Sequence, residues 1–455
     1  MGIQLNNNSF ISVWKTDNTG TSNNDQITLP LLNNSTNNFI ANWGDGTSDT
    51  ITAYNAAEIT HTYASAGTYT VTLNGTIGAF HFNNGGDKLK ILEIKQWGSS
   101  TLGATIRGFW GTRNCDITAM DRPTITGIQL ERAFAQSGTD VVGGNPFRNI
   151  GTWDIKTITN INNAFQDNVS FNEPLNDWYM DNKTSLYLTF EGCERFNQPL
   201  NKWNTSNITN IRQTFENNYK FNGKVDGWDT SNVIYGYRAF LTAREFNQPL
   251  TSWRLPIFRE LNHFFAGCQV FNQPVAQLAI SSSCTNMQSC FQTCHKFNQP
   301  IDNWIPSNVT NTSFMFNNAL VFNQPLNSWD VGSVTTMFLM FEGAVSFNQP
   351  LNNWDTSNVT NMGRVFRDAT AFDQSLADWD VSNVTSMALM FSGAALSTEN
   401  YDATLIGWAN QDVQSNVSFH GGNSTYTGTP GNDASASRAQ LINSYSWTII
   451  DGGSA

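Results

Sequence analysis

The chain has 455 residues, of which 39% are hydrophobic and 13% are charged, and its formal net charge is -12. This hydrophobic content excludes a wholly disordered chain, and the acidic balance disfavours non-specific nucleic-acid binding, which requires a basic face. No apolar run is long enough to cross a bilayer, so membrane insertion is not expected, and no signal peptide is visible at the first residues.

Residues 1–80 show short alternating apolar segments separated by glycine-rich turns. The clearest of these segments are 10–14, 39–43, 59–63 and 68–73. Such alternation is typical of strands with one buried face, so the sequence predicts an antiparallel β-sandwich.

The motif Trp43-Gly-Asp-Gly-Thr47, followed by His61-Thr-Tyr63 and by Gly-Thr-Tyr-Thr-Val at 67–71, closely resembles the PKD-type immunoglobulin-like domain. The resemblance implies a spacer or a module for weak contacts. Asp45 in this motif has three interpretations: a calcium ligand, a catalytic carboxylate, or the acceptor of an Asx-type turn. We favour the turn, because no second acidic cluster stands close in sequence.

Residues 81–150 follow a looser pattern, with strand-like segments at 80–82 and 90–94. Segment 124–130, followed by Ala133 and Phe134, matches an irregular repeat. We therefore expect this stretch to form the first coils of a solenoid and to cover the edge of its first regular coil.

Residues 151–395 contain a regular repeat whose most conspicuous part is Phe-Asn-Gln-Pro-Leu. It stands intact at 196–200, 246–250, 322–326 and 347–351, and near-copies keep a step of 25 or 26 residues. One short strand (such as Val-Thr-Asn-Met) and one helical turn per coil indicate a parallel solenoid of leucine-rich-repeat type.

Two aromatic columns follow this period and are expected to form the core ladders. One column contains Trp153, Trp178, Trp203, Trp228, Trp253, Leu278, Trp304, Trp329, Trp354 and Trp379. The other contains Phe165, Phe190, Phe215, Phe240, Phe265, Phe291, Phe316, Phe341, Phe366 and Phe391.

The repeat unit Phe-Asn-Gln-Pro-Leu-Asn-Asn-Trp-Asp-Thr-Ser-Asn-Val-Thr-Asn-Met at 347–362 is similar to that of the BspA-like leucine-rich-repeat surface proteins. The resemblance covers more than half of the chain. It implies an extracellular recognition or adhesion protein without a catalytic centre, and it leaves the ligand open.

The repeat also explains most cysteines and an asparagine column. Cys193, Cys268 and Cys294 fall where other coils have alanine, so we interpret them as small buried residues. Cys268 and Cys294 belong to neighbouring coils, which leaves a disulfide open. The asparagines after the first phenylalanine are expected to form a side-chain ladder that satisfies backbone groups. No cysteine or histidine set matches a metal site, so no cofactor or metal is expected.

Residues 396–455 leave the repeat. Helices are expected at 400–409 and 435–444, and strands at 417–419 and 447–450. Such a segment fits a small α+β cap at the end of the solenoid. The predicted fold is thus mainly β, with a sandwich at 1–80, irregular coils at 81–150, regular coils at 151–395 and a cap at 396–455.

Two further columns are candidate functional sites. An acidic column follows the tryptophans: Asp154, Asp229, Asp330, Asp355 and Asp380. Carboxylates on neighbouring coils could serve a glycosidase, but the surrounding turn motif favours a capping role.

The other column is a pair of unfixed positions after Met362 and its equivalents. We call these pairs the variable strip. It is rich in Tyr, Arg, Phe and His, which are residue types that dominate recognition sites. Its candidate ligand-binding members are Tyr187, Arg212, Tyr237, Arg238, His263, Phe314, Phe338, Leu339 and Arg364. The alternative is a solvent-exposed face with incidental aromatics.

These features predict a non-enzymatic recognition or adhesion protein displayed on a cell surface or virion, which binds a glycan or a protein. A structural virion component, such as a fibre, tail or decoration protein in contact with other virion subunits, is the alternative. A polysaccharide-cleaving solenoid enzyme is the third and weakest hypothesis.

Overall fold

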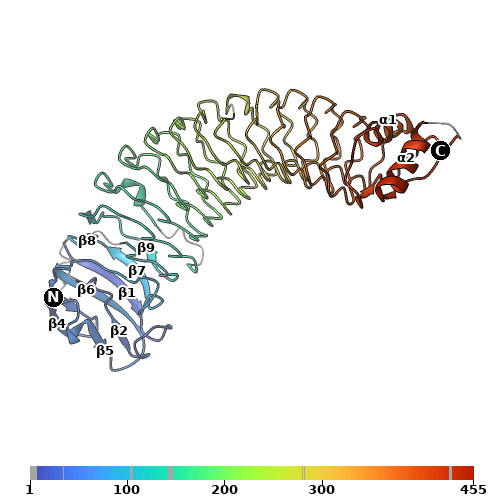
Figure 1. Cartoon of the computed structure of the whole chain (residues 1–455). Coiled ribbons are helices and arrows are strands. Elements are labelled where there is room, and N and C mark those ends of the chain that lie inside the picture. Colours follow the sequence, from blue (N-terminus) through green and yellow to red (C-terminus); the bar gives the residue numbers. More distant parts are fainter. Residues whose placement is uncertain are drawn as a thin grey trace. The chain divides into compact units, whose positions relative to one another are not determined.

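The computed structural model describes residues 8–33, 35–102, 106–141, 147–278, 280, 282–429 and 433–455. The chain forms two compact units, residues 1–228 and 229–455, and each is described by itself. The prediction of a mainly β chain with few helices is confirmed (Figure 1).

The first unit begins with two small antiparallel sheets. The larger contains β4, β3, β6 and β1 in that order, and the smaller pairs β2 with β5. These strands are β1 (Phe10–Lys15), β2 (Gln26–Thr28), β3 (Asn38–Asn42), β4 (Ser48–Ile51), β5 (Thr60–Thr62) and β6 (Thr68–Thr76), with a 3₁₀ turn η1 (Ala57–Ile59) before β5. Trp14, Trp43, Val71 and Leu73 are fully buried. The four strands expected in this region are therefore confirmed.

The larger sheet continues beyond residue 80 and changes direction there. β7 (Ile91–Gln96) pairs antiparallel with β1, whereas β9 (Asp116–Ile117) pairs parallel with β7. β8 (Thr101–Leu102) and β10 (Thr124–Ile125) form a second parallel pair. β7 thus joins the antiparallel domain to the parallel coils of the same unit.

Two predicted strands are shorter in the structure than expected. The strand at 80–82 is reduced to one antiparallel bridge between Phe80 and Leu31. In the repeats, the strand of each coil is reduced to one parallel bridge, as between Asn361 and Ser386. Short 3₁₀ turns occur at η2 (Ile150–Thr152) and η3 (Ala276–Leu278).

The strands of the coils are short because the backbone N–H groups after each bridge donate alternately to the next coil and to their own coil. The N–H groups of Met362 and Arg364 donate to the next coil, at 2.8 Å to the Ser386 carbonyl and 2.9 Å to the Ala388 carbonyl. The N–H of Val365 instead bonds within its own coil, to Met362. Consecutive turns therefore replace a continuous strand while every second donor still joins the coils.

The expected aromatic ladders form the core of both units. Phe190 and Phe215 stack at 5.7 Å in the first unit, and Phe316 and Phe341 stack at 5.5 Å in the second. Most column tryptophans also donate the indole N–H to a carbonyl of the preceding coil, as from Trp354 to Leu326 at 2.9 Å. Trp153 is an exception, since its Nε1 is buried and has no hydrogen-bond partner in the described chain. The aromatic columns thus supply buried area and satisfy polar groups between many neighbouring coils.

The asparagine ladder is confirmed. Oδ1 of Asn323 accepts the backbone N–H of Asn348 at 2.9 Å and Nε2 of Gln349 at 3.0 Å. In the first unit, Oδ1 of Asn172 accepts the N–H of Asn197 at 2.9 Å. The Asn and Gln of the repeated motif therefore act together between neighbouring coils.

All six cysteines are free and buried. Cys268 and Cys294, for which a disulfide was open, each donate a thiol to a phenylalanine carbonyl, of Phe240 and Phe265 respectively. Burial raises the pKa of both thiols above their ordinary value. The interpretation of these cysteines as small core residues is confirmed.

The C-terminal segment folds into the expected helices and strands. They are α1 (Thr398–Ala409), β11 (Ser418–His420), α2 (Asp433–Tyr445) and β12 (Thr448–Ile450). Trp408 of α1 donates its indole N–H to the Leu376 carbonyl at 3.0 Å, which continues the tryptophan column. Within the described ranges, no helix is long and apolar enough to cross a membrane.

Candidate functional site

The acidic column acts as a set of turn acceptors. The carboxylates of Asp355 and Asp380 accept the backbone N–H groups of Ser357 and Ser382, at 3.0 and 2.9 Å. The side-chain and backbone hydrogen bonds from Ser357 lower the pKa of Asp355. These carboxylates are thus engaged in local turns, which matches the capping role expected for them.

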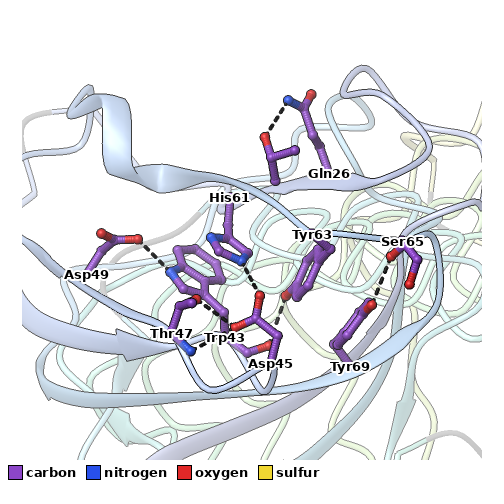
Figure 2. A network of polar contacts seen from close by, with 10 residues as sticks. Gln26, Trp43, Asp45, Thr47, Asp49, His61, Tyr63, Ser65 and Tyr69 are labelled. Carbon is purple, nitrogen blue, oxygen red and sulfur yellow. Dashed lines mark hydrogen bonds and ion pairs between the residues drawn. The ribbon is translucent and has the colours of Figure 1, made fainter.

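Asp45 also accepts the hydrogen bonds of an Asx-type turn, as predicted. One carboxylate oxygen accepts the N–H of Thr47 at 2.9 Å and its hydroxyl at 2.6 Å. The other oxygen lies 2.8 Å from Nε2 of His61, whose ring stacks on Trp43 at 4.7 Å (Figure 2). Burial raises the pKa of Asp45, but the bonds from Thr47 and His61 outweigh it and lower the pKa to about 2.

Aromatic rings extend this network towards β6. Tyr63 stacks on Tyr69 at 3.7 Å and donates its hydroxyl to the Trp43 carbonyl at 3.0 Å (Figure 2). His61 also packs against Tyr63 at 4.5 Å. The whole network therefore serves to fix the loop between β3 and β4 against the neighbouring strands.

In the second unit, the structure brings several members of the variable strip into contact. Tyr237 and His263 pack edge to face at 5.9 Å, and the guanidinium of Arg238 lies 4.7 Å from the Tyr237 ring. Burial, followed by the charge of Arg238, lowers the pKa of His263. All three side chains are half-buried.

A second aromatic contact lies further along the same unit. Phe314 and Phe338 pack edge to face at 5.6 Å. A Cβ added at Gly363 would lie 3.3 Å from the Phe338 ring, so this ring covers the glycine of the next coil. Leu339 is only 6% exposed and belongs to the core, whereas Arg364 is half-buried.

In the first unit, Tyr187 and Arg212 occupy successive coils. The Asn163 N–H donates to the Tyr187 carbonyl at 2.9 Å, and the Leu188 N–H donates to the Arg212 carbonyl at 3.2 Å. The same backbone hydrogen bond thus recurs along the strip: the N–H of the second residue of one pair donates to the carbonyl of the first residue of the next pair.

The second residue of each pair has a left-handed backbone. The φ angles of Arg238, His263, Phe314, Leu339 and Arg364 lie between 57° and 63°. This region is unfavourable for residues other than glycine, asparagine and aspartate. The expectation of two unconstrained positions is therefore wrong for the second one, whose backbone is fixed although its side chain varies.

The structure also shows strip residues that the sequence analysis did not include. Arg107 and Arg132 have φ angles of 65° and 52°, and both precede a buried phenylalanine by two residues, as Arg364 precedes Phe366. The guanidinium groups of Arg107 and Arg132 lie 5.5 and 5.2 Å from the Trp110 ring. The spacing to the phenylalanine was the signal that could have identified them.

No group of three or more His, Cys, Asp or Glu residues that could hold a metal ion occurs in the described part of the chain.

In comparisons with known proteins, two family models match the chain. The family model described as "Mycoplasma protein of unknown function, DUF285" matches residues 129–253, 184–304, 237–354 and 285–408, which together cover more than half of the chain. The PKD domain model matches residues 13–79. No curated protein and no solved structure matches the chain.

Proposed function

Because the chain belongs to the family described as "Mycoplasma protein of unknown function, DUF285" and carries an N-terminal PKD domain, we propose that it is a surface-displayed recognition or adhesion protein. Its ligand is a glycan or a protein on another surface. A repeat family of surface-protein type is compatible with this role.

The variable strip is the observation that carries the proposal. The columns on either side of the strip are nearly fixed, whereas the strip presents half-buried aromatic and basic side chains. Tyr237 with His263 and Phe314 with Phe338 form adjoining aromatic surfaces rather than scattered single residues. Rigid aromatic groups on a fixed backbone lower the entropic cost of binding.

We also propose that the coils form a BspA-like parallel solenoid of leucine-rich-repeat type. The parallel bridges at intervals of one repeat within each unit support this architecture. In such a stack, each coil adds one pair of strip residues, so the length of the binding surface follows the number of coils.

A non-enzymatic role is part of the proposal. The carboxylates of the acidic column, which would have been the acid and base of a glycosidase, accept hydrogen bonds from their own turns. Their pKa values, where shifted, are lowered, as for Asp229 and Asp355, which is opposite to what a general acid requires.

The test uses the full chain on a printed glycan array and on immobilised extracellular glycoproteins. Joint replacement of Tyr187, Tyr237 and Phe338 by alanine should abolish capture with little change in melting temperature. Joint replacement of Tyr54, Tyr179 and Tyr219 by alanine is the matched control, because these tyrosines lie outside the strip. Capture that survives the strip substitutions would refute the proposal.

A further inference from the structure

The first coils of the first unit bring two arginines to one tryptophan. Trp110 lies beside two guanidinium groups from successive coils, those of Arg107 and Arg132. The coils are held in register because the Arg107 N–H donates to the Glu131 carbonyl at 2.8 Å. Phe109 and Phe134, each two residues after one of these arginines, stack at 5.9 Å, as expected for neighbouring coils.

Neither arginine forms an ion pair with any described residue, although the protein has a net charge of -12. Nε of each guanidinium is buried and has no hydrogen-bond partner in the described chain. Arg107 donates through NH1 to Asn83 at 3.3 Å. Buried polar atoms without partners are rare and require an explanation.

Glu131 stands next to Arg132 in sequence, and its Oε2 accepts Nδ2 of Asn160 at 3.2 Å. The positive charge of Arg107 contributes, after burial, to the lowered pKa of His81. Two cations beside one ring, neither with an ion-pair partner among the described residues, favour the binding of an anion that can join them.

We propose that Arg107, Trp110 and Arg132 form a binding site for an anionic polysaccharide. Guanidinium groups bind oxyanions through paired hydrogen bonds, and the indole supplies an apolar surface beside them. Carboxylate and sulfate groups share this oxyanion chemistry. The inference rests on the proposed recognition function and names the ligand class for the strip residues of the first coils.

The left-handed backbone supplies a clean test. Asparagine tolerates this conformation better than most residues, so Arg107→Asn with Arg132→Asn removes both charges and should keep the fold. The charge-matched control is Arg113→Asn with Arg195→Asn, since both arginines are exposed and Arg113 already pairs with Asp140 at 3.1 Å. Melting temperatures of both double variants establish that they are folded.

Binding of the full chain would be measured by calorimetry with polygalacturonate, dextran sulfate, neutral dextran and phosphatidylserine vesicles. The natural chain should bind polygalacturonate, dextran sulfate or both, and neither dextran nor the vesicles. The Arg107 and Arg132 double variant should lose at least tenfold in affinity, and the control less than twofold. The two anionic polymers distinguish a carboxylate ligand from a sulfate ligand.

Absence of binding to both anionic polymers would overturn the inference, as would equal binding to dextran, binding only to the vesicles, or equal losses in the two double variants. The proposed function would survive any of these results if the Tyr187, Tyr237 and Phe338 substitutions still abolished capture of other ligands. The two proposals can therefore fail separately.

Discussion

A carboxylate oxygen of Asp45 lies 2.8 Å from Nε2 of His61, and the same carboxyl group accepts two hydrogen bonds from Thr47. These bonds outweigh burial and lower the pKa of Asp45 from 3.8 to about 2. The folded state thus releases this proton at lower pH than the unfolded state. The associated stability is present above about pH 4 and is lost as pH falls towards 2.

Replacement of Asp45 by asparagine should therefore reduce the loss of stability that the PKD domain shows as pH falls. Hydrogen exchange of residues 43–63 in the full chain, from pH 5 to pH 2, would measure the effect. The natural chain should lose ~1 kcal/mol of local stability in this range, allowing for solvent screening of an accessible carboxylate. Equal acid sensitivity in the two proteins would contradict the role assigned to the Asp45–His61 pair.

Glu191 provides a prediction of opposite sign. Burial, followed by the negative charge of Asp167, raises its pKa from 4.5 to about 7. The folded state then holds a proton that the unfolded state has released, so stability falls as pH rises from about 4.5 to about 7. Glu191→Gln should stabilise the first unit at pH 8 by about 1–2 kcal/mol, after allowance for partial exposure.

The measurement is urea unfolding at pH 8 and pH 5, with Glu194→Gln as control because Glu194 is an exposed acid three residues away. The gain in stability from Glu191→Gln should vanish at pH 5. A gain of similar size for the control, or one that persists at pH 5, would show that general charge reduction is responsible.

The asparagine ladder should be sensitive to loss of its acceptor. Asn323→Ala leaves the N–H of Asn348 and Nε2 of Gln349 without their shared partner, which should cost ~1–3 kcal/mol. Asn323→Asp keeps the acceptor and is the matched control, since Asp373 already occupies this column and accepts the Ser397 N–H at 2.7 Å. Hydrogen exchange of residues 322–350 would compare them, and equal destabilisation would refute the ladder's contribution.

The left-handed strip position should discriminate between side chains. At Arg364, with φ of 58°, a β-branched residue is strained, whereas asparagine is tolerated. Arg364→Val should therefore lower the stability of the second unit by ~1 kcal/mol relative to Arg364→Asn. Denaturant unfolding of the two variants tests this, and identical midpoints would mean that the backbone is not constrained in solution.

Much of the fold follows from the period of the sequence. Buried columns repeat because each coil meets the same neighbours, so Phe316, Trp354 and Cys268 could be assigned to the core in advance. The strand of each coil was overestimated, because the buried Val359 and Met362 are three residues apart, a spacing that fits successive turns rather than the period of two of a strand. Burial determines which side chains repeat, but it does not specify the φ angle of an unburied residue.

The strip was identified by its lack of repetition, and this explains what was missed. When only the backbone of a position is constrained, many different side chains can stand there. The left-handed residues Arg238 and Arg364 were therefore interpreted as unconstrained. A second left-handed column does carry a signal, since glycine, asparagine and aspartate occupy most of it, as at Gly192, Gly343 and Asp368, although Thr242 and Thr293 also stand there. Arg107 and Arg132 lay outside the regular period, where only the spacing to phenylalanine identifies them.

Asp373 has a further consequence for assembly. It stands where other coils have the ladder asparagine, but its carboxylate accepts the N–H and hydroxyl of Ser397 and the amide of Asn400 at the start of α1. The carboxylate that would otherwise accept a hydrogen bond from a further coil is thus occupied by residues at the start of the chain's own helix. The start of α1 therefore takes the place that a further coil would occupy at this column, so this acceptor is not available to a second molecule.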